Sequence, residues 1–266
     1  MKKYRHLLLA GTALLAINAF GSDTAHAQDI TVTTSGTSQQ WGANASLLSG
    51  NIEDAFEDDT VLIDSAVNNF DLIVENDGTA RDLPPPMFGP PSPIEFTIGD
   101  IQDDSSNADL VVRSGPNPNN DPTVLTITQD AQLNGSVNVF NNDGDNASVD
   151  VNADTFDIGG NLDITNSDTD TPTDVVVRAD SDIEVTGNTT VTAGNAAGAN
   201  ALLAIVGTST LPSGVTLDDG TLGRASLAFE GTSGQTLDFN VEGDTDGEGS
   251  LIIRNSAGVT IDTAVG

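Results

Sequence analysis

The feature that most constrains the fold is a pattern written three times between Val124 and Thr192. Each copy begins with apolar residues that alternate with polar ones and continues through an acidic residue, a second alternating pair, a glycine and a third alternation. The copies read VLTITQDAQLNGSVNV, VDVNADTFDIGGNLDI and VVVRADSDIEVTGNTTV; their acids are Asp130, Asp154 and Asp180, and their glycines are Gly135, Gly160 and Gly187. Alternation at every second residue is typical of a strand. Recurrence at a nearly constant interval indicates that the copies stack.

The interval continues towards the C-terminal end. The last inward residue of the first strand in each copy is predicted to be a core residue, and these are Ile127, Val151, Val177, Ile205, Phe229 and Ile253, at intervals of 24, 26, 28, 24 and 24 residues. Three short strands with their turns fit into such a length, and a single coil has too little core to be stable alone. We therefore predict an all-β fold, a parallel β-helix or β-solenoid of 24–28 residues per coil, with regular repeats over 124–266. Crossover chirality favours a right-handed winding.

The N-terminal segment is typical of an export signal. A basic start, Met1–His6, is followed by an apolar run from Leu7 to Phe20 and by the small-x-small triplet Ala25-His26-Ala27. The run is too short to span a bilayer as a helix, so we predict a cleavable signal peptide over 1–27. The protein is therefore expected to be exported, to the extracellular space or the outer cell surface.

Composition after residue 27 narrows the possible chemistry. This part of the chain has no histidine, lysine, cysteine or tyrosine, and it carries five arginines against 39 acids. Such a charge repels nucleic acid, so no nucleic-acid partner is expected. Without cysteine no disulfide can staple the fold, so its stability must come from the stacked core. Histidine, cysteine and lysine catalysis are excluded, as is a zinc site of the usual ligands.

Residues 28–123 are less regular. We predict an N-terminal cap with irregular coils here, with strands over Ile30–Thr34, Val61–Ile63 and Asp71–Glu75. The six prolines in 83–93 cannot sit inside a strand ladder, because proline has no N–H to donate. That segment is predicted to be an extended loop, or alternatively a recognition loop that presents Met87 and Phe88 to a partner.

Acidic turns make calcium a candidate ligand. Hard oxygen ligands at alternate positions are what Ca²⁺ takes, and the candidate residues are Asp143, Asp145, Asp168, Asp170, Asp244 and Asp246. The segment Glu242–Glu248 resembles the opening of an EF-hand loop, but the twelfth position is Ile253 rather than glutamate. The alternative is that these side chains only satisfy turn backbones and keep the surface soluble.

The export signal, the cysteine-free acidic chain and repeats such as Asp157–Ile164 and Ile183–Val191 resemble the passenger region of bacterial autotransporters and related β-strand-repeat surface proteins. The resemblance implies a Gram-negative source, display on the cell surface, adhesion or a stalk role, and association with the outer membrane. The chain differs by ending at Ala264–Gly266 inside the repeat pattern, with no membrane barrel of amphipathic strands. Membrane association would then depend on a C-terminal part missing from this sequence.

These features predict a secreted or cell-surface structural or adhesive β-solenoid that has no catalytic centre. Its partner would be a host or environmental surface, through a glycan or protein ligand, and self-association is a further expectation. One alternative is a calcium-dependent component of an extracellular matrix or surface layer. A second alternative is a polysaccharide-active β-helix enzyme that uses paired acids.

Overall fold

A computed structural model describes residues 30–33, 38–41, 60–64, 70–76, 94–103, 108–114, 122–141, 147–245 and 248–266. Within these ranges the chain forms strands, turns and bends, and it contains no helix, hence none that could span a membrane. The predicted signal peptide at 1–27 and the proline-rich loop at 83–93 lie outside the described residues.

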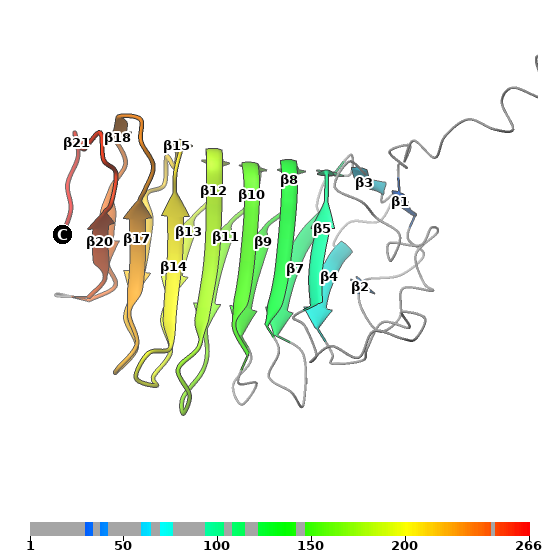
Figure 1. The fold of residues 1–266 in the computed structure, drawn as a ribbon, viewed down its shortest axis with the longest axis horizontal. Helices are drawn as coiled ribbons and strands as arrows, with labels where there is room; N and C mark the ends of the chain where they lie inside the picture. Colours follow the sequence, from blue (N-terminus) through cyan, green and yellow to red (C-terminus); the bar gives the residue numbers. More distant parts are fainter. Residues whose placement is uncertain are drawn as a thin grey trace, which may run out of the picture.

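The described strands form a parallel β-solenoid. The long sheet holds β1 (Ile30–Thr33), β3 (Thr60–Asp64), β6 (Asp100–Asp103), β8 (Thr123–Leu133), β10 (Val149–Ile158), β12 (Asp174–Val185), β14 (Asn200–Ile205), β17 (Ala225–Phe229) and β20 (Ser250–Ile253) in that order, with β5 (Ile94–Ile98) beside β8 and β15 (Thr208–Thr210) beside β12. The second sheet runs from β2 (Ser38–Trp41) through β4 (Phe70–Asn76), β7 (Ala108–Ser114), β9 (Val137–Asn141), β11 (Leu162–Asn166), β13 (Thr189–Thr192) and β16 (Val215–Asp218) to β19 (Val241–Gly243). A short third sheet pairs β18 (Gln235–Leu237) with β21 (Val259–Ile261). Figure 1 shows the strands of successive coils side by side along the long axis.

The strand register confirms the coil repeat and corrects two of its intervals. Stacked partners in the long sheet are Leu125, Val151, Val177, Leu203, Leu227 and Leu251, at intervals of 26, 26, 26, 24 and 24 residues. Ile127 therefore stacks on Ala153 and not on Val151. In the second and third copies the last inward residues of the first strand are Ala153 and Ala179, two positions after the predicted Val151 and Val177. The prediction missed them because an alanine side chain is too small to stand out as an apolar position.

The predicted core residues are buried, with one exception. Ile127, Val151, Val177, Ile205 and Phe229 are at most 1% exposed, whereas Ile253 is 47% exposed. Ile253 stacks on Phe229 as its place in the repeat requires, but β20 is the last strand in the sheet order, so no described strand covers its other side.

The first two predicted strands of each regular copy are one long, bent strand. β8, β10 and β12 each run through the expected corner, and the register between neighbours shifts there, between Ala153 and Thr155. Asp154 lies at this irregularity and its carboxylate accepts a hydrogen bond from the hydroxyl of Ser181 on the next coil. An extra residue that bends a strand without ending it is the usual effect of a β-bulge.

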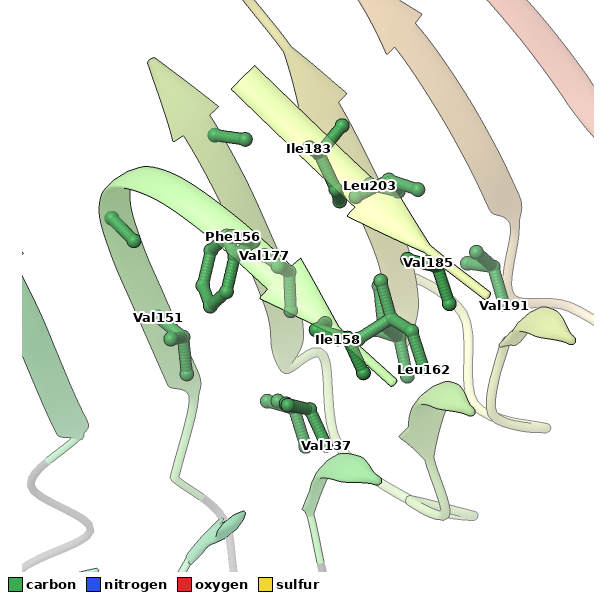
Figure 2. Close-up of a cluster of buried hydrophobic side chains, with 14 of the residues drawn as sticks. Val137, Val151, Phe156, Ile158, Leu162, Val177, Ile183, Val185, Val191 and Leu203 are labelled. Atoms are coloured by element: carbon green, nitrogen blue, oxygen red, sulfur yellow. The ribbon is translucent and has the colours of Figure 1, made fainter. Parts of the chain in front are cut away.

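The core is a set of columns of stacked side chains, and one of them places a large side chain next to a small one. Phe156 stacks between Ala131 and Ile183, and all three side chains are fully buried. Figure 2 shows Phe156 beside the column that contains Val151, Val177 and Leu203, and opposite the residues of the second sheet. A phenylalanine is accommodated at one level because its neighbour below is an alanine, which keeps the packing dense.

One core column contains a buried hydroxyl group that lacks a hydrogen-bond partner among the described residues. Thr189 is 2% exposed and stacks between Leu162 and Val215, and its hydroxyl makes no hydrogen bond with any residue that the structure describes. A Thr189→Val substitution keeps the shape and removes the buried polar atom, so we expect it to stabilise the fold by about 1 kcal/mol in urea unfolding. Thr190→Val, one residue along and facing outward, is the control and should not stabilise. A loss of stability in Thr189→Val would contradict the described environment.

Candidate functional site

The acid-rich segments lie in the loops that follow the strands of the second sheet. The loops at 167–173, 193–199 and 219–224 are described, and Figure 1 shows the loops gathered along one edge of the solenoid. Two buried asparagines at the ends of second-sheet strands bond to residues just before the next long strand: the side-chain amide of Asn141 donates to the carbonyl of Ala147 at 2.9 Å, and that of Asn166 to the carbonyl of Thr173 at 2.8 Å. Asn166 therefore closes the described loop 167–173 at its base.

Successive loops are bonded to one another. The backbone N–H groups of Asn195 and Ala196 donate to the carbonyl of Asp168, at 2.9 and 3.2 Å. In the following coil the backbone N–H and the hydroxyl of Thr221 both donate to Oδ1 of Asn195, at 3.0 and 2.9 Å. The loops form a continuous edge in which each loop fixes the next. We call residues 167–173, 193–199 and 219–224 the loop edge.

Among the predicted calcium residues, Asp168 is the one held most tightly. It is fully buried, and its two oxygens accept hydrogen bonds from the backbone of Asp170 and Thr171 and from the hydroxyls of Thr171 and Thr173. Burial disfavours the charged carboxylate, but these four hydrogen bonds outweigh it and hold the pKa of Asp168 below its usual value. In this geometry Asp168 serves as the internal cap of its own loop.

The other predicted calcium residues are dispersed. Asp170 is exposed on the same loop as Asp168, whereas Asp143, Asp145 and Asp246 lie outside the described residues. Asp244 is placed differently, because its carboxylate faces two others. The structure therefore does not bring the predicted residues together as one group, and calcium binding by them stays a prediction.

Three carboxylates meet where β16 and β19 end. Asp218, Asp244 and Glu248 have carboxylate oxygens within 4.8 Å of one another. Asp218 and Asp244 are 26 residues apart, one coil, and follow the paired residues Leu217 and Gly243. Burial raises the pKa of Asp218, and the negative charges of Asp244, Glu248 and Asp219 raise it further. Such a group can share a proton or offer hard oxygen ligands to a divalent cation.

Asp218→Asn is expected to stabilise the fold at neutral pH. Because the folded-state pKa of Asp218 is raised, the folded protein binds this proton more tightly than the unfolded chain, and the repulsion is fully present once the pH exceeds the raised value. The gain should be about 0.5 kcal/mol in chelator after allowance for solvent screening, and it should vanish as the pH falls below roughly 4. Urea unfolding at several pH values measures it.

Asp262→Asn, an exposed acid of the last coil, is the matched control. A titration of both variants with Ca²⁺ then tests the calcium prediction. If the three carboxylates bind the ion, the wild-type protein and Asp262→Asn gain melting temperature and Asp218→Asn does not. An equal gain in all three would place any calcium effect elsewhere.

Comparisons with known proteins assign this chain to no family. No protein-family model, curated protein or solved structure matches this chain. The resemblance to autotransporter passengers therefore extends, at the level of structure, to the parallel β-solenoid alone.

The outer face of the long sheet carries an ion-pair ladder that spans four coils, from β12 to β20. Arg178 donates to Glu230 at 2.6 Å and to Asp180 at 2.8 Å, and Arg254 donates to Glu230 at 3.1 Å. The positions stacked above Arg178 in the register are Ala204 and then Ala228, which are both buried. Alanine at these outward positions leaves the arginine space to reach two coils along.

Glu230→Gln is expected to destabilise the protein by about 1 kcal/mol at pH 7, after discounting for the partial exposure of both arginines. The hydrogen bond from Arg178 lowers the pKa of Glu230 against the opposing effect of burial, and Arg254 lowers it further. The stabilisation is therefore present above the ordinary glutamate pKa and is lost as the pH falls through the lowered value. Unfolding curves of the variant and the parent should converge in acid. A difference that persists there would point to packing and not to charge.

Proposed function

We propose that this protein is exported and exposed at the cell surface, where it acts as a structural or adhesive β-solenoid and not through a catalytic centre. The observation that supports this most directly is the loop edge. Its loops are bonded from coil to coil through Asp168, Asn195 and Thr221, so they present a fixed surface on a rigid body. Loops held by a rigid scaffold are where proteins usually place their binding functions.

The core supports the same role. Its columns continue from coil to coil without disulfides, so the solenoid can act as a spacer whose length follows from the number of coils. After residue 27 the chain has five arginines against 39 acids, and this negative charge keeps such a body soluble.

Exposure is tested by expressing the full chain in a Gram-negative host. Proteinase added to intact cells should digest the protein if it is displayed, and culture medium should contain it if it is released. A protein found only in the cytoplasm, with residues 1–27 still attached, would overturn the proposal.

Adhesion is tested with beads coated with the exported protein and applied to epithelial, plant and abiotic surfaces. Asp170→Lys changes an exposed acid on the loop edge, and Glu184→Lys makes the same change on the strand β12. Binding should be altered by Asp170→Lys and unchanged by Glu184→Lys. Equal effects of the two would show that net charge, and not the loop edge, governs adhesion.

The two alternative functions stay predictions with tests of their own. A calcium-dependent matrix component would assemble only with divalent cation, which light scattering with and without chelator measures. A polysaccharide-active enzyme would release new reducing or unsaturated ends from neutral or acidic glycans.

A further inference from the structure

A groove of about 560 Å³ lies on the outer face of the long sheet, beside the loop at 219–224. Its floor includes Val176 and Leu202, which are register partners on β12 and β14. Leu222 from the loop and Ile252 from β20 add further aliphatic surface. The volume falls within the range of roughly 300–1,000 Å³ that small-molecule sites occupy.

The loop that forms one wall is preformed. Leu222 is 65% exposed, yet its loop is fixed on both sides, because the N–H of Gly223 donates to the carbonyl of Gly194 at 3.1 Å and the N–H of Thr221 to Asn195 at 3.0 Å. The other large apolar side chains that are exposed in the described residues all belong to the last coil, and they are Ile253, Ile261 and Val265. The side chain of Leu222 is therefore exposed to solvent although its loop is fixed by hydrogen bonds.

The rim of the groove is polar and offers both donors and acceptors. Oδ1 of Asp174 accepts a hydrogen bond from the side chain of Asn200 at 3.0 Å, and Oδ1 of Asp219 accepts one from the N–H of Ala225 at 2.5 Å. These bonds orient both carboxylates and leave the second oxygen of each for a further donor.

Arg224 completes the rim and differs from the neighbouring arginines. Arg178 and Arg254 both pair with Glu230, whereas the guanidinium of Arg224 has no ion pair or hydrogen bond with any residue that the structure describes. A guanidinium presents its donors in a planar fork that matches a carboxylate. At the edge of the groove, Arg224 therefore has guanidinium donors that an external anion could use.

The surroundings restrict what that anion can belong to. A peptide could not add here as a strand, because β14 and β17 are already hydrogen-bonded to neighbours on both sides. Polyanions are repelled by the formal charge of −32. A purely aliphatic acid would offer no hydrogen-bond donor to the second carboxylate oxygens of Asp174 and Asp219.

We propose that this groove binds a sugar residue that carries a carboxylate. Arg224 pairs with the carboxylate, Asp174 and Asn200 bond to hydroxyl groups, and Leu222 packs against the C–H face of the ring. The proposal gives a ligand class to the adhesive role and rests on that proposed function for its biological purpose. Because no aromatic ring lines the groove, binding should be weak, in the millimolar range.

The test is an NMR titration of the ¹⁵N-labelled exported protein with glucuronic acid and, in parallel, with glucose. Glucuronic acid should shift the backbone amides of Gly223 and Arg224 and the side-chain amide of Asn200, with an affinity roughly tenfold above that of glucose. Arg224→Gln should abolish the preference for glucuronic acid. Leu222→Ser should weaken the binding of both sugars.

Each variant has a matched control outside the groove. Arg254→Gln removes a different arginine from the same sheet face, and Ile261→Ser removes an exposed apolar side chain from the last coil, so both should bind like the parent. Equal affinity for the two sugars, shifts confined to residues outside the groove, or an unchanged preference in Arg224→Gln would each overturn the proposal. None of these results bears on surface display, which the proteinase experiment measures separately.

Discussion

Val151→Asp is expected to destabilise the protein by about 4 kcal/mol in urea unfolding followed by circular dichroism. The side chain of Val151 is fully buried and stacks between Leu125 and Val177. An aspartate there would have aliphatic groups above and below it and no hydrogen-bond donor. It would either stay charged without a partner or fold only in its protonated form, and both outcomes cost free energy. The stability of the variant should therefore recover partly in acid.

Val176→Asp is the matched control for that experiment. It makes the same substitution at an outward position of a neighbouring strand, where the side chain is partly exposed. We expect a cost below about 1 kcal/mol, because water and counterions reach the carboxylate. Similar losses in the two variants would contradict the assignment of faces that both the alternation and the structure support.

The core could be predicted from the sequence because most inward positions are apolar in successive coils. The coil interval itself was wrong in two places, and alanine was the cause. Ala153 and Ala179 occupy the same inward column as Ile127 and Ile205. The two alanines are register partners, and each has an isoleucine on its other side, so their inward position becomes evident only when the copies are stacked.

The candidate sites were predicted less well, for two physical reasons. An aspartate in a polar loop is expected at the surface, but the side chain of Asp168 is buried. Its own loop gives it four hydrogen bonds, and nothing in the sequence indicated them. The closeness of Asp218 and Asp244 could have been predicted, because 26 residues separate them and this equals one coil interval. The approach of Glu248 and the groove beside Leu222 both depend on loop geometry, where periodicity carries no information.

The glycine of each regular copy allows two coils to approach closely at one corner. The N–H of Gly160 donates to the carbonyl of Gly135 at 2.8 Å, and the N–H of Gly187 donates to the carbonyl of Gly160 at 2.9 Å. A Cβ on Gly160 would lie 2.6 Å from the carbonyl carbon and oxygen of Gly135. These are backbone atoms of the preceding coil, so they cannot move aside as a flexible side chain would.

Gly160→Ala is therefore expected to destabilise the protein by about 3 kcal/mol, because the coils must separate at this corner and weaken both hydrogen bonds. Gly234→Ala provides the control, since a Cβ there meets no atom within 4 Å and its backbone does not adopt a positive φ. It should melt at or slightly above the temperature of the parent, because alanine reduces the freedom of the unfolded chain. If Gly160→Ala also melted like the parent, the corner would have to relax by itself, and the recurring glycine would then reflect the local turn and not the spacing between coils.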